Sequence, residues 1–269
     1  MSKFVKFEDF NHTRVITFNR PEKKNAFNEE MLKDISTIIK DSENESNIRT
    51  IIITSVGEKI FSSGYDISSD SIDSKESLLK IHLIDKDTKN HPLMEVSKII
   101  KESSKIVIAA INGSIFGGTL EVMLNCDFKF FSKESIFCMP PVKLGIFYNY
   151  DGLRNFINKV GISNTKKIFF TGDKFNAKEA EEMKIFDFIV DHKDVLKESL
   201  KFAEKISENA PLSLASIKVS INTFEDSQRI SENDYLKIKE SILKAANSMD
   251  YIEAQDAFKS KRKPKFQGK

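Results

Sequence analysis

Two glycine-containing segments of this sequence are candidates for presenting backbone amides to a ligand. Phe61-Ser62-Ser63-Gly64-Tyr65-Asp66-Ile67 follows a predicted buried strand, and Gly117-Gly118 lies where a second such strand runs into a helix. Glycine allows close approach to the main chain, and the first amides of a helix lack intrahelical acceptors. If the two strands are neighbours, the amides converge as an oxyanion hole, in which one donor typically contributes about 10²–10³ in rate. An ordinary Gly-Asp turn and close helix packing are the alternatives.

Three further features carry groups that such a site would use. Glu121 lies in the first turn of the predicted helix, where it acts as a general acid or base or is stabilised by the helix dipole. Tyr148, in a loop beside Tyr150, either lines a pocket or packs with a satisfied hydroxyl. From Lys259 onward the chain has six basic residues and no acidic one, which fits a phosphate contact or a frayed tail.

The elements that would position these residues begin with a βαβ pattern. A strand is predicted at residues 15–18, a helix after the N-cap Asn28, and a buried strand with three consecutive isoleucines at residues 49–54. Residues 106–111 are predicted as a second buried strand that leads into the glycine pair, and residues 128–131 as a further strand. We therefore expect a sheet with helices packed on it.

The second half of the chain has mostly helical patterns. Residues 62–76 are predicted as an exposed loop, residues from about 77 to 102 as helical with an interruption near residues 90–92, and residues 186–190 as a short strand. The helices predicted beyond residue 150 cover residues 163–171, 177–184, 193–208, 212–224, 231–247 and 249–260. The chain thus divides into an α/β part (1–190) and a helical part (191–269), which we expect to pack as one unit.

The composition restricts the class of protein. The 269 residues are 40% hydrophobic and 30% charged, a balance that can bury a sizeable core. The net charge of +2 argues against a protein that wraps around nucleic acid. Two cysteines exclude a disulfide framework, and the four scattered histidines lack metal-site spacing. Because the sequence has no signal-peptide or membrane-spanning pattern, we expect a cytoplasmic protein without a membrane partner.

In their order and spacing the motifs resemble the crotonase family, also called the enoyl-CoA hydratase/isomerase superfamily. The resemblance extends from about residue 12 to the end of the chain. The family fold is an α/β spiral of ββα units with a helical C-terminal region, which usually mediates homotrimers or dimers of trimers. The motifs that carry the resemblance are Asn19-Arg20-Pro21, Asn25-Ala26-Phe27, Ser63 to Ile67, Asn112-Gly113, Gly117-Gly118 with Glu121, Thr171-Gly172 before Ala177-Lys178-Glu179-Ala180, and Phe258 to Pro264.

The resemblance implies a site for acyl-CoA thioesters, with coenzyme A as part of the substrate and no separate cofactor or metal. The amides that hold the thioester oxygen would be those of Tyr65 and Gly118. Phe258 and Lys261 match the place where family members contact the phosphates of CoA, often across a subunit boundary. The other residues implied in substrate or CoA binding are Lys24, Ala26, Phe27, Ser63, Gly64, Asp66, Ile67, Gly117, Pro140 and Pro141.

One departure from the family pattern narrows the predicted reaction. Family hydratases use two glutamates to activate water; Glu121 matches the first, but Pro141 occupies the place of the second. Proline has no acid–base chemistry, which argues against hydration by paired carboxylates and weakens a one-glutamate isomerase. The segment from Met139 to Gly145, followed by Tyr148, resembles the methylmalonyl-CoA decarboxylase branch, in which a tyrosine at this position lies near the substrate carboxylate. That branch typically has histidine in place of Tyr65.

The predicted function is therefore decarboxylation of a short (alkyl)malonyl-CoA, such as methylmalonyl-CoA, by a crotonase-family lyase. Loss of carbon dioxide leaves an enolate, which needs the oxyanion hole but no base to remove a carbon-bound proton. Tyr148 would orient the carboxylate, and Glu121 would shape the pocket or handle a proton. The alternatives are an enoyl-CoA hydratase or isomerase that relies on Glu121 alone, and a non-catalytic acyl-CoA-binding or RNA-binding homologue.

Overall fold

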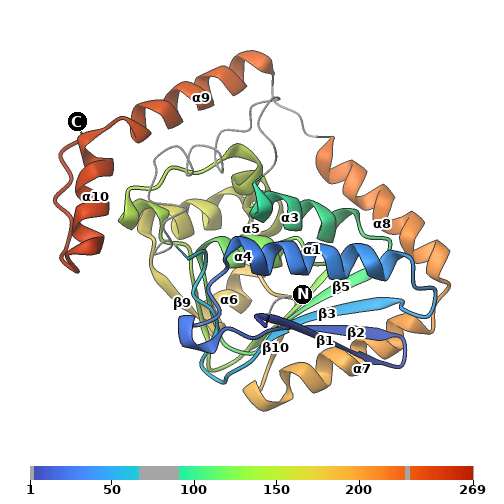
Figure 1. Cartoon of the computed structure of the whole chain (residues 1–269). Helices are drawn as coiled ribbons and strands as arrows, with labels where there is room; N and C mark the ends of the chain where they lie inside the picture. Colours follow the sequence, from blue (N-terminus) through green and yellow to red (C-terminus); the bar gives the residue numbers. More distant parts are fainter. Residues whose placement is uncertain (1–2, 67–90, 228–230, 269) are drawn as a thin grey trace.

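The computed structural model describes residues 3–66, 91–227 and 231–268, which fold around two β-sheets flanked by helices (Figure 1). In these ranges the larger sheet has the strand order β1-β2-β3-β5-β7-β10. β1 is antiparallel to β2, and the other neighbouring strands are parallel. The strands of this sheet are β1 (Val5–Phe10), β2 (Thr13–Phe18), β3 (Thr50–Ser55), β5 (Ile106–Ile111), β7 (Phe128–Ser132) and β10 (Phe188–Val190).

The second sheet consists of short strands that continue three of the long ones. Its order in the described ranges is β4-β6-β8-β9, with β9 antiparallel to β8 and the other pairs parallel. The pairs β3–β4, β5–β6 and β7–β8 repeat one design, a long strand and then a short one before the next helix. This repeat is the ββα unit that the resemblance implies. The short strands are β4 (Ile60–Ser62), β6 (Ser114–Phe116), β8 (Ile136–Cys138) and β9 (Lys174–Asn176).

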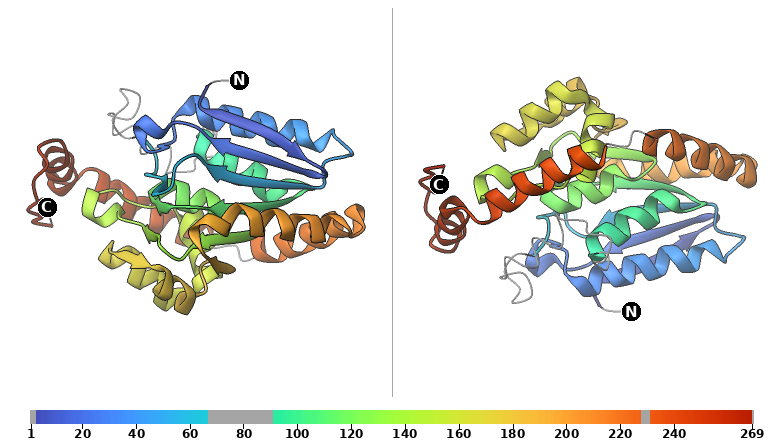
Figure 2. Two further views of the ribbon diagram at one scale, coloured as in Figure 1. Left: turned by 90° about the horizontal axis from the view of Figure 1, so that it is seen from below. Right: turned by 90° about the horizontal axis from the view of Figure 1, so that it is seen from above.

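Helices cover the larger sheet, and the last two described helices, α9 and α10, form a C-terminal arm (Figures 1 and 2). The first helix begins where the N-cap pattern predicts, since the Asn28 side chain accepts from the amide of Met31 at 2.9 Å. The described helices are α1 (Glu29–Glu43), α3 (Pro92–Glu102), α4 (Gly117–Leu124), α5 (Tyr150–Thr171), α6 (Ala177–Met183), α7 (Val195–Ser207), α8 (Pro211–Asp226), α9 (Glu232–Ala246) and α10 (Met249–Lys259), with the 3₁₀ turns η1 (Pro21–Lys23), η2 (Pro141–Leu144) and η3 (His192–Asp194).

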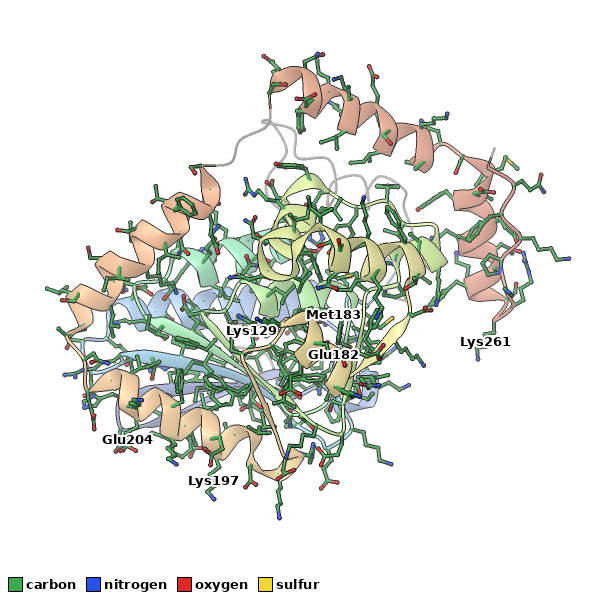
Figure 3. All side chains as sticks on the ribbon, turned by 180° about the vertical axis from the view of Figure 1, so that it is seen from behind. Lys129, Glu182, Met183, Lys197, Glu204 and Lys261 are labelled. Carbon is green, nitrogen blue, oxygen red and sulfur yellow. The ribbon has the colours of Figure 1, made fainter. Side chains whose placement is uncertain are left out.

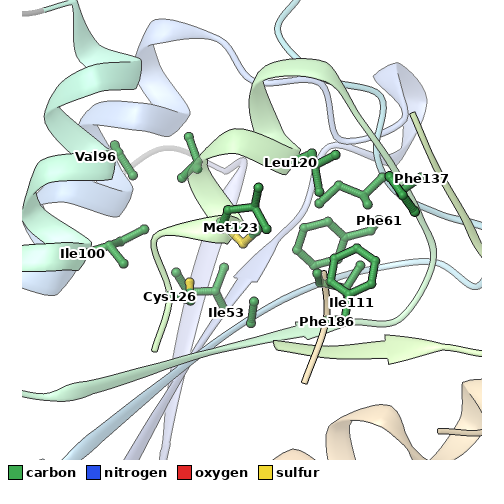
Figure 4. Close-up of a cluster of buried hydrophobic side chains, with 14 of the residues drawn as sticks. Ile53, Phe61, Val96, Ile100, Ile111, Leu120, Met123, Cys126, Phe137 and Phe186 are labelled. Atoms are coloured by element: carbon green, nitrogen blue, oxygen red, sulfur yellow. The ribbon is translucent and has the colours of Figure 1, made fainter. Parts of the chain in front are cut away.

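The central strands are buried on both faces because alternate side chains point to opposite helix layers. Ile51 and Ile53 of β3 belong to a core shared with α1, α3 and α4, whereas Ile52 belongs to a second core with α7. The run of isoleucines that predicts a doubly covered strand therefore has helices on each side. Figure 4 shows part of the first core, where the labelled side chains of the sheet meet those of α3 and α4.

The turn from β5 to β6 places the two sheets relative to each other. A Cβ on Gly113 would lie 2.7 Å from the backbone nitrogen of Phe61, so only glycine allows this approach. The Asn112 side chain donates to the carbonyls of Ser55 and Gly57, both at 3.0 Å. The Asn112-Gly113 motif thus joins the β5–β6 turn to the β3–β4 turn, and the segments that follow β4 and β6 become neighbours.

Several elements differ from the sequence predictions. α5 begins at Tyr150, well before the predicted start near residue 163, and Gly161 interrupts its helical backbone with a φ of 74°. Glycines lower helix propensity in this half of α5 and obscure its periodicity. The short strands of the second sheet were not predicted, because three residues carry no period. The predicted structure of residues 67–90 lies outside the described residues.

The C-terminal arm returns to the core through α10. A Cβ on Gly145, which follows η2, would lie 2.5 Å from the Cβ of Ala254, so α10 rests directly on this turn. None of the helices in the described ranges combines the length and apolar character that a bilayer span requires. The division of the chain at residue 190 stays a prediction.

Candidate active site

The two glycine segments meet at the ends of β4 and β6, which are parallel neighbours. Gly64 has a φ of +102°, and a Cβ there would lie 3.1 Å from the carbonyl oxygen of Phe116. A Cβ on Gly118 would lie 3.9 Å from the Cβ of Tyr65. These approaches bring the main chain at Tyr65 next to the main chain at Gly118, as the sequence analysis expects for neighbouring strands.

Backbone hydrogen bonds around Tyr65 determine where its amide points. The carbonyl of Gly64 accepts from Phe27, and the amide of Asp66 donates to Phe27, both at 2.8 Å. Since alternate residues of an extended chain face opposite edges, the Tyr65 N–H points away from Phe27. Gly118 is the second residue of α4, where an N–H has no intrahelical acceptor. Both residues line the same cavity.

Two buried hydroxyl groups join the segments that carry these amides. Ser62 Oγ donates to the carbonyl of Asn25 at 2.7 Å. Thr119 Oγ1, 2.8 Å from Ser62 Oγ, therefore donates to it. The same serine oxygen accepts from the amide of Gly64 at 3.2 Å. One side chain thus links the loop before Tyr65 to the first turn of α4 and sets the spacing of the two amides.

Arg20 supports this loop from behind. Its Nη1 lies 2.8 Å from Asp66 Oδ2, and the two side chains are only 11% and 7% exposed. The same nitrogen donates to the carbonyl of Ala26 at 3.0 Å, and Asn25 Oδ1 accepts from the Arg20 amide at 2.9 Å. Charge-assisted hydrogen bonds of this kind are strong and directional. The Arg20 and Asn25 motifs are therefore structural, and they hold the residue that follows Tyr65.

Glu121, which is buried, and Tyr148, which is half-buried, form a pair in the cavity. The Tyr148 hydroxyl donates to Glu121 Oε2. Burial raises the pKa of Glu121 to about 7, against the opposing effect of the Tyr148 hydrogen bond, and nearby Asp151 raises it further. Burial and the charge of Glu121 raise the pKa of Tyr148 well above its usual value. Near neutral pH Glu121 therefore exchanges between its charged and neutral forms, while Tyr148 keeps its proton.

Gly152 makes room for this pair at the start of α5. A Cβ there would lie 2.6 Å from both Glu121 Oε1 and Tyr148 Cε1. The Asn149 side chain accepts from the Gly152 amide at 2.6 Å and caps the helix. The residues after Tyr148 thus determine where α5 starts and keep its first turn clear of the glutamate.

A cavity of about 710 Å³ contains the amides and the pair. It is lined by most of the residues expected from the sequence, and Pro141 is part of its wall. Its described carboxylates besides Glu121 are Asp66, which is paired with Arg20, and the exposed Glu22. The sequence-predicted residues in its lining are Lys24, Ala26, Ser63, Gly64, Tyr65, Asp66, Gly117, Gly118, Glu121, Pro140, Pro141, Tyr148 and Phe258.

Two of the sequence-predicted residues that the structure describes do not line this cavity. Phe27 is fully buried behind the wall, with its ring centroid 5.0 Å from that of Phe18. Lys261 lies at the outer end of α10, away from the sheets (Figure 3). Ile67 lies outside the described residues.

The structure also places residues at the site that were not predicted there. His91, at the N-cap of α3, has Nε2 3.4 Å from the Tyr65 hydroxyl. The sequence analysis treats residues 90–92 only as a helix interruption, and a polar side chain before a proline was the available signal. The described residues contain no group of three metal-ligand side chains. The apolar residues added to the lining are Ile60, Leu93, Phe116, Met139, Leu144 and Ile146.

The chain is similar to known proteins in both sequence and structure. The family model described as Enoyl-CoA hydratase/isomerase matches residues 10–269. The chain is 29% identical over 267 residues to methylmalonyl-CoA decarboxylase of Escherichia coli, covering 99% of this chain and 98% of the relative. It is 31% identical over 208 residues to short-chain-enoyl-CoA hydratase of Clostridium acetobutylicum, covering 77% of each. A crystal structure of methylmalonyl-CoA decarboxylase complexed with 2S-carboxypropyl CoA has a TM-score of 0.90 at 29% identity, covering 100% of both chains.

Proposed function

The chain belongs to the enoyl-CoA hydratase/isomerase family and has its crotonase-like fold, and from that premise we propose that it decarboxylates a short (alkyl)malonyl-CoA such as methylmalonyl-CoA. Membership supports an enzyme that acts on acyl-CoA thioesters. One observation supports decarboxylation in particular. Glu121 is hydrogen-bonded to Tyr148 in a cavity whose wall includes Pro141, at the position where the resemblance implies a second glutamate in hydratases.

The proposed reaction breaks the bond between the acyl Cα and its carboxylate. Carbon dioxide leaves without the bonding electron pair, which becomes an enolate delocalised onto the thioester oxygen. The amides of Tyr65 and Gly118 are proposed to bind that oxygen, since both residues line the cavity side by side. The enolate then takes a proton at Cα to give the shorter thioester. An apolar wall such as Pro141 solvates a carboxylate poorly and so favours its loss.

Tyr148 is proposed to orient the departing carboxylate, with Glu121 controlling its proton. When Glu121 is ionised, the Tyr148 proton is held by Glu121 Oε2. When Glu121 is protonated, it can donate to the tyrosine oxygen, and the Tyr148 hydroxyl can then direct its hydrogen bond to the substrate carboxylate. Because the pKa of Glu121 is raised to about 7, both arrangements are accessible near neutral pH.

Hydration or isomerisation of an enoyl-CoA by Glu121 alone is the second candidate. Two observations favour it: a buried carboxylate with a pKa of about 7 is suited to act as a base, and one relative is a short-chain-enoyl-CoA hydratase. The remaining carboxylates of the described wall do not complete a pair, because Asp66 is bound to Arg20 and Glu22 lies on the exposed turn η1. Decarboxylation needs no second carboxylate, and we therefore prefer it.

Product analysis separates the two candidates. Purified protein is incubated separately with methylmalonyl-CoA and with crotonyl-CoA, and the products are identified by mass spectrometry. The proposal predicts propionyl-CoA and carbon dioxide from the first and no change in the second. Hydrated crotonyl-CoA together with unchanged methylmalonyl-CoA would contradict the proposal and assign the site to the second candidate.

CoA binding and assembly are proposed from the surfaces around the cavity. Lys24 and Phe258 at the wall are proposed to contact CoA, together with Lys261 at the outer end of α10. We propose a homotrimer or a dimer of trimers, with α8 in the subunit contact, because its apolar side chains Leu212 and Phe224 are 85% and 75% exposed. Light scattering after size-exclusion chromatography tests the assembly, and a monomer would contradict it.

A further inference from the structure

The cavity contains a second tyrosine hydroxyl with a partner of its own. Tyr65 Oη lies 3.4 Å from His91 Nε2, and the two ring centroids are 5.3 Å apart. His91 is the N-cap of α3, and its Nδ1 accepts from the amide of Leu93 at 3.2 Å. Three groups are therefore connected in series: a backbone amide, an imidazole and a phenol.

The backbone sets the direction of this series. A backbone N–H can only donate, so His91 Nδ1 carries no proton, and the neutral ring has its proton on Nε2. Nε2 then donates to Tyr65 Oη, and the Tyr65 hydroxyl is left to donate its own proton in another direction. No side chain in residues 3–66, 91–227 or 231–268 accepts that proton. Tyr65 lines the cavity, so a ligand there is positioned to accept it.

Both groups are neutral over a wide pH range. Burial lowers the pKa of His91 to about 4, against the opposing charge of Glu29. Burial, with the charges of Glu29 and Asp66, raises the pKa of Tyr65 to about 12. The series therefore provides an uncharged donor whose direction does not change near neutral pH.

We propose that the Tyr65 hydroxyl binds the carboxylate of the malonyl-type acyl group and that His91 is the residue that positions it. The inference rests on the proposed function, in which the Tyr65 amide holds the thioester oxygen. The carboxylate of a malonyl thioester is attached to the carbon next to that thioester carbon, within the span of one tyrosine. A neutral donor binds this anion without the strong ground-state stabilisation that a cation would give, so loss of carbon dioxide stays favourable.

The test uses two CoA derivatives that differ only in the carboxylate. Calorimetric titration with 2S-carboxypropyl CoA and with propyl-CoA measures the selectivity of the protein for the carboxylate. Tyr65→Phe removes the hydroxyl and keeps the backbone amide. We expect it to lose affinity for 2S-carboxypropyl CoA by about 10-fold or more, as for a hydrogen bond to a charged group, with propyl-CoA binding unchanged.

His91→Asn is the matched variant for the positioning role. Asparagine keeps a side-chain oxygen that caps α3, but it is too short to reach Tyr65. We expect a smaller loss of the same selectivity, about 3-fold, with the thermal stability retained. Selectivity that survives in both variants would overturn this inference alone. A wild-type protein without selectivity for 2S-carboxypropyl CoA would overturn the proposed function and this inference together.

Discussion

The two tyrosines of the cavity differ in their hydrogen bonds: the hydroxyl of one donates to its partner, and the hydroxyl of the other accepts from its partner. The Tyr148 hydroxyl donates a hydrogen bond to Glu121, whose pKa is raised to about 7 by burial. The Tyr65 oxygen accepts a hydrogen bond from His91, whose pKa of about 4 keeps the imidazole neutral. The first hydroxyl is therefore available to a substrate only when its partner is protonated, whereas the second is available at any pH near neutrality.

This difference shows how one cavity can recognise a carboxylate with one hydroxyl and control how that carboxylate is held with the other. A donor with a constant state is suited to recognising a carboxylate. A donor that depends on a group titrating near pH 7 is suited to controlling how that carboxylate is held. Both hydroxyls lie in the cavity that contains the amides of Tyr65 and Gly118. The roles proposed for the two tyrosines require that those amides bind the thioester oxygen.

The largest expected effect therefore comes from the amides. Gly118→Pro removes an N–H donor, and we expect turnover of any thioester to fall by at least about 10²-fold. Gly118→Ala is the matched control, because it keeps the amide and its Cβ would lie 3.2 Å from the flexible end of the Leu93 side chain. Steady-state kinetics on both variants, with circular dichroism to check folding, measures the effect. Equal activity of the proline variant and the wild type would exclude the Gly118 amide.

Tyr148→Phe is expected to have the next largest effect. Removing a hydroxyl that contacts a charged group lowers kcat for decarboxylation by about 10–100-fold, with little change in affinity for CoA itself. The kinetic constants and a CoA titration check this prediction. An unchanged kcat would show that Tyr148 has no role in the mechanism. Tyr65 would then be the only one of the two tyrosines with a proposed role.

How far the site could be predicted from the sequence depends on the type of residue. Gly64, Gly118 and Glu121 line one cavity in the structure, and the sequence could single them out because glycines and a carboxylate at strand ends form a local pattern; their catalytic roles stay predictions. The role of Arg20 in supporting Asp66 was not predicted, since it joins residues 46 positions apart. A salt bridge between residues so far apart in the sequence produces no periodic pattern from which it could be predicted.

The Tyr65–His91 contact shows the same limit. The sequence analysis notes that Tyr65 stands where a related branch has histidine, but it gives His91 no role. The structure brings His91 to Tyr65 because α3 begins beside the site and its N-cap side chain faces Tyr65. Such a contact depends on the packing of α3 against α4, which is a property of the folded core.

The smallest expected effect concerns the space around the Glu121–Tyr148 pair. Gly152→Ala introduces a Cβ 2.6 Å from Glu121 Oε1 and from Tyr148 Cε1, so both side chains must shift. We expect the free energy of unfolding to decrease by about 1–3 kcal/mol and kcat to decrease moderately. Urea denaturation and kinetics measure both quantities. Unchanged stability and activity would show that the pair is loosely packed.

The pH dependence of decarboxylation tests the central claim most directly. Because the pKa of Glu121 is raised to about 7, the carboxyl is protonated below this pH and ionised above it. We predict that the rate with methylmalonyl-CoA falls as pH rises through about 7, because ionised Glu121 then accepts the hydrogen bond of the Tyr148 hydroxyl. In Glu121→Gln the amide can donate to the tyrosine oxygen at every pH, so the profile should be flat. A wild-type rate that instead rises through pH 7 would show that Glu121 acts as a base and would contradict the account.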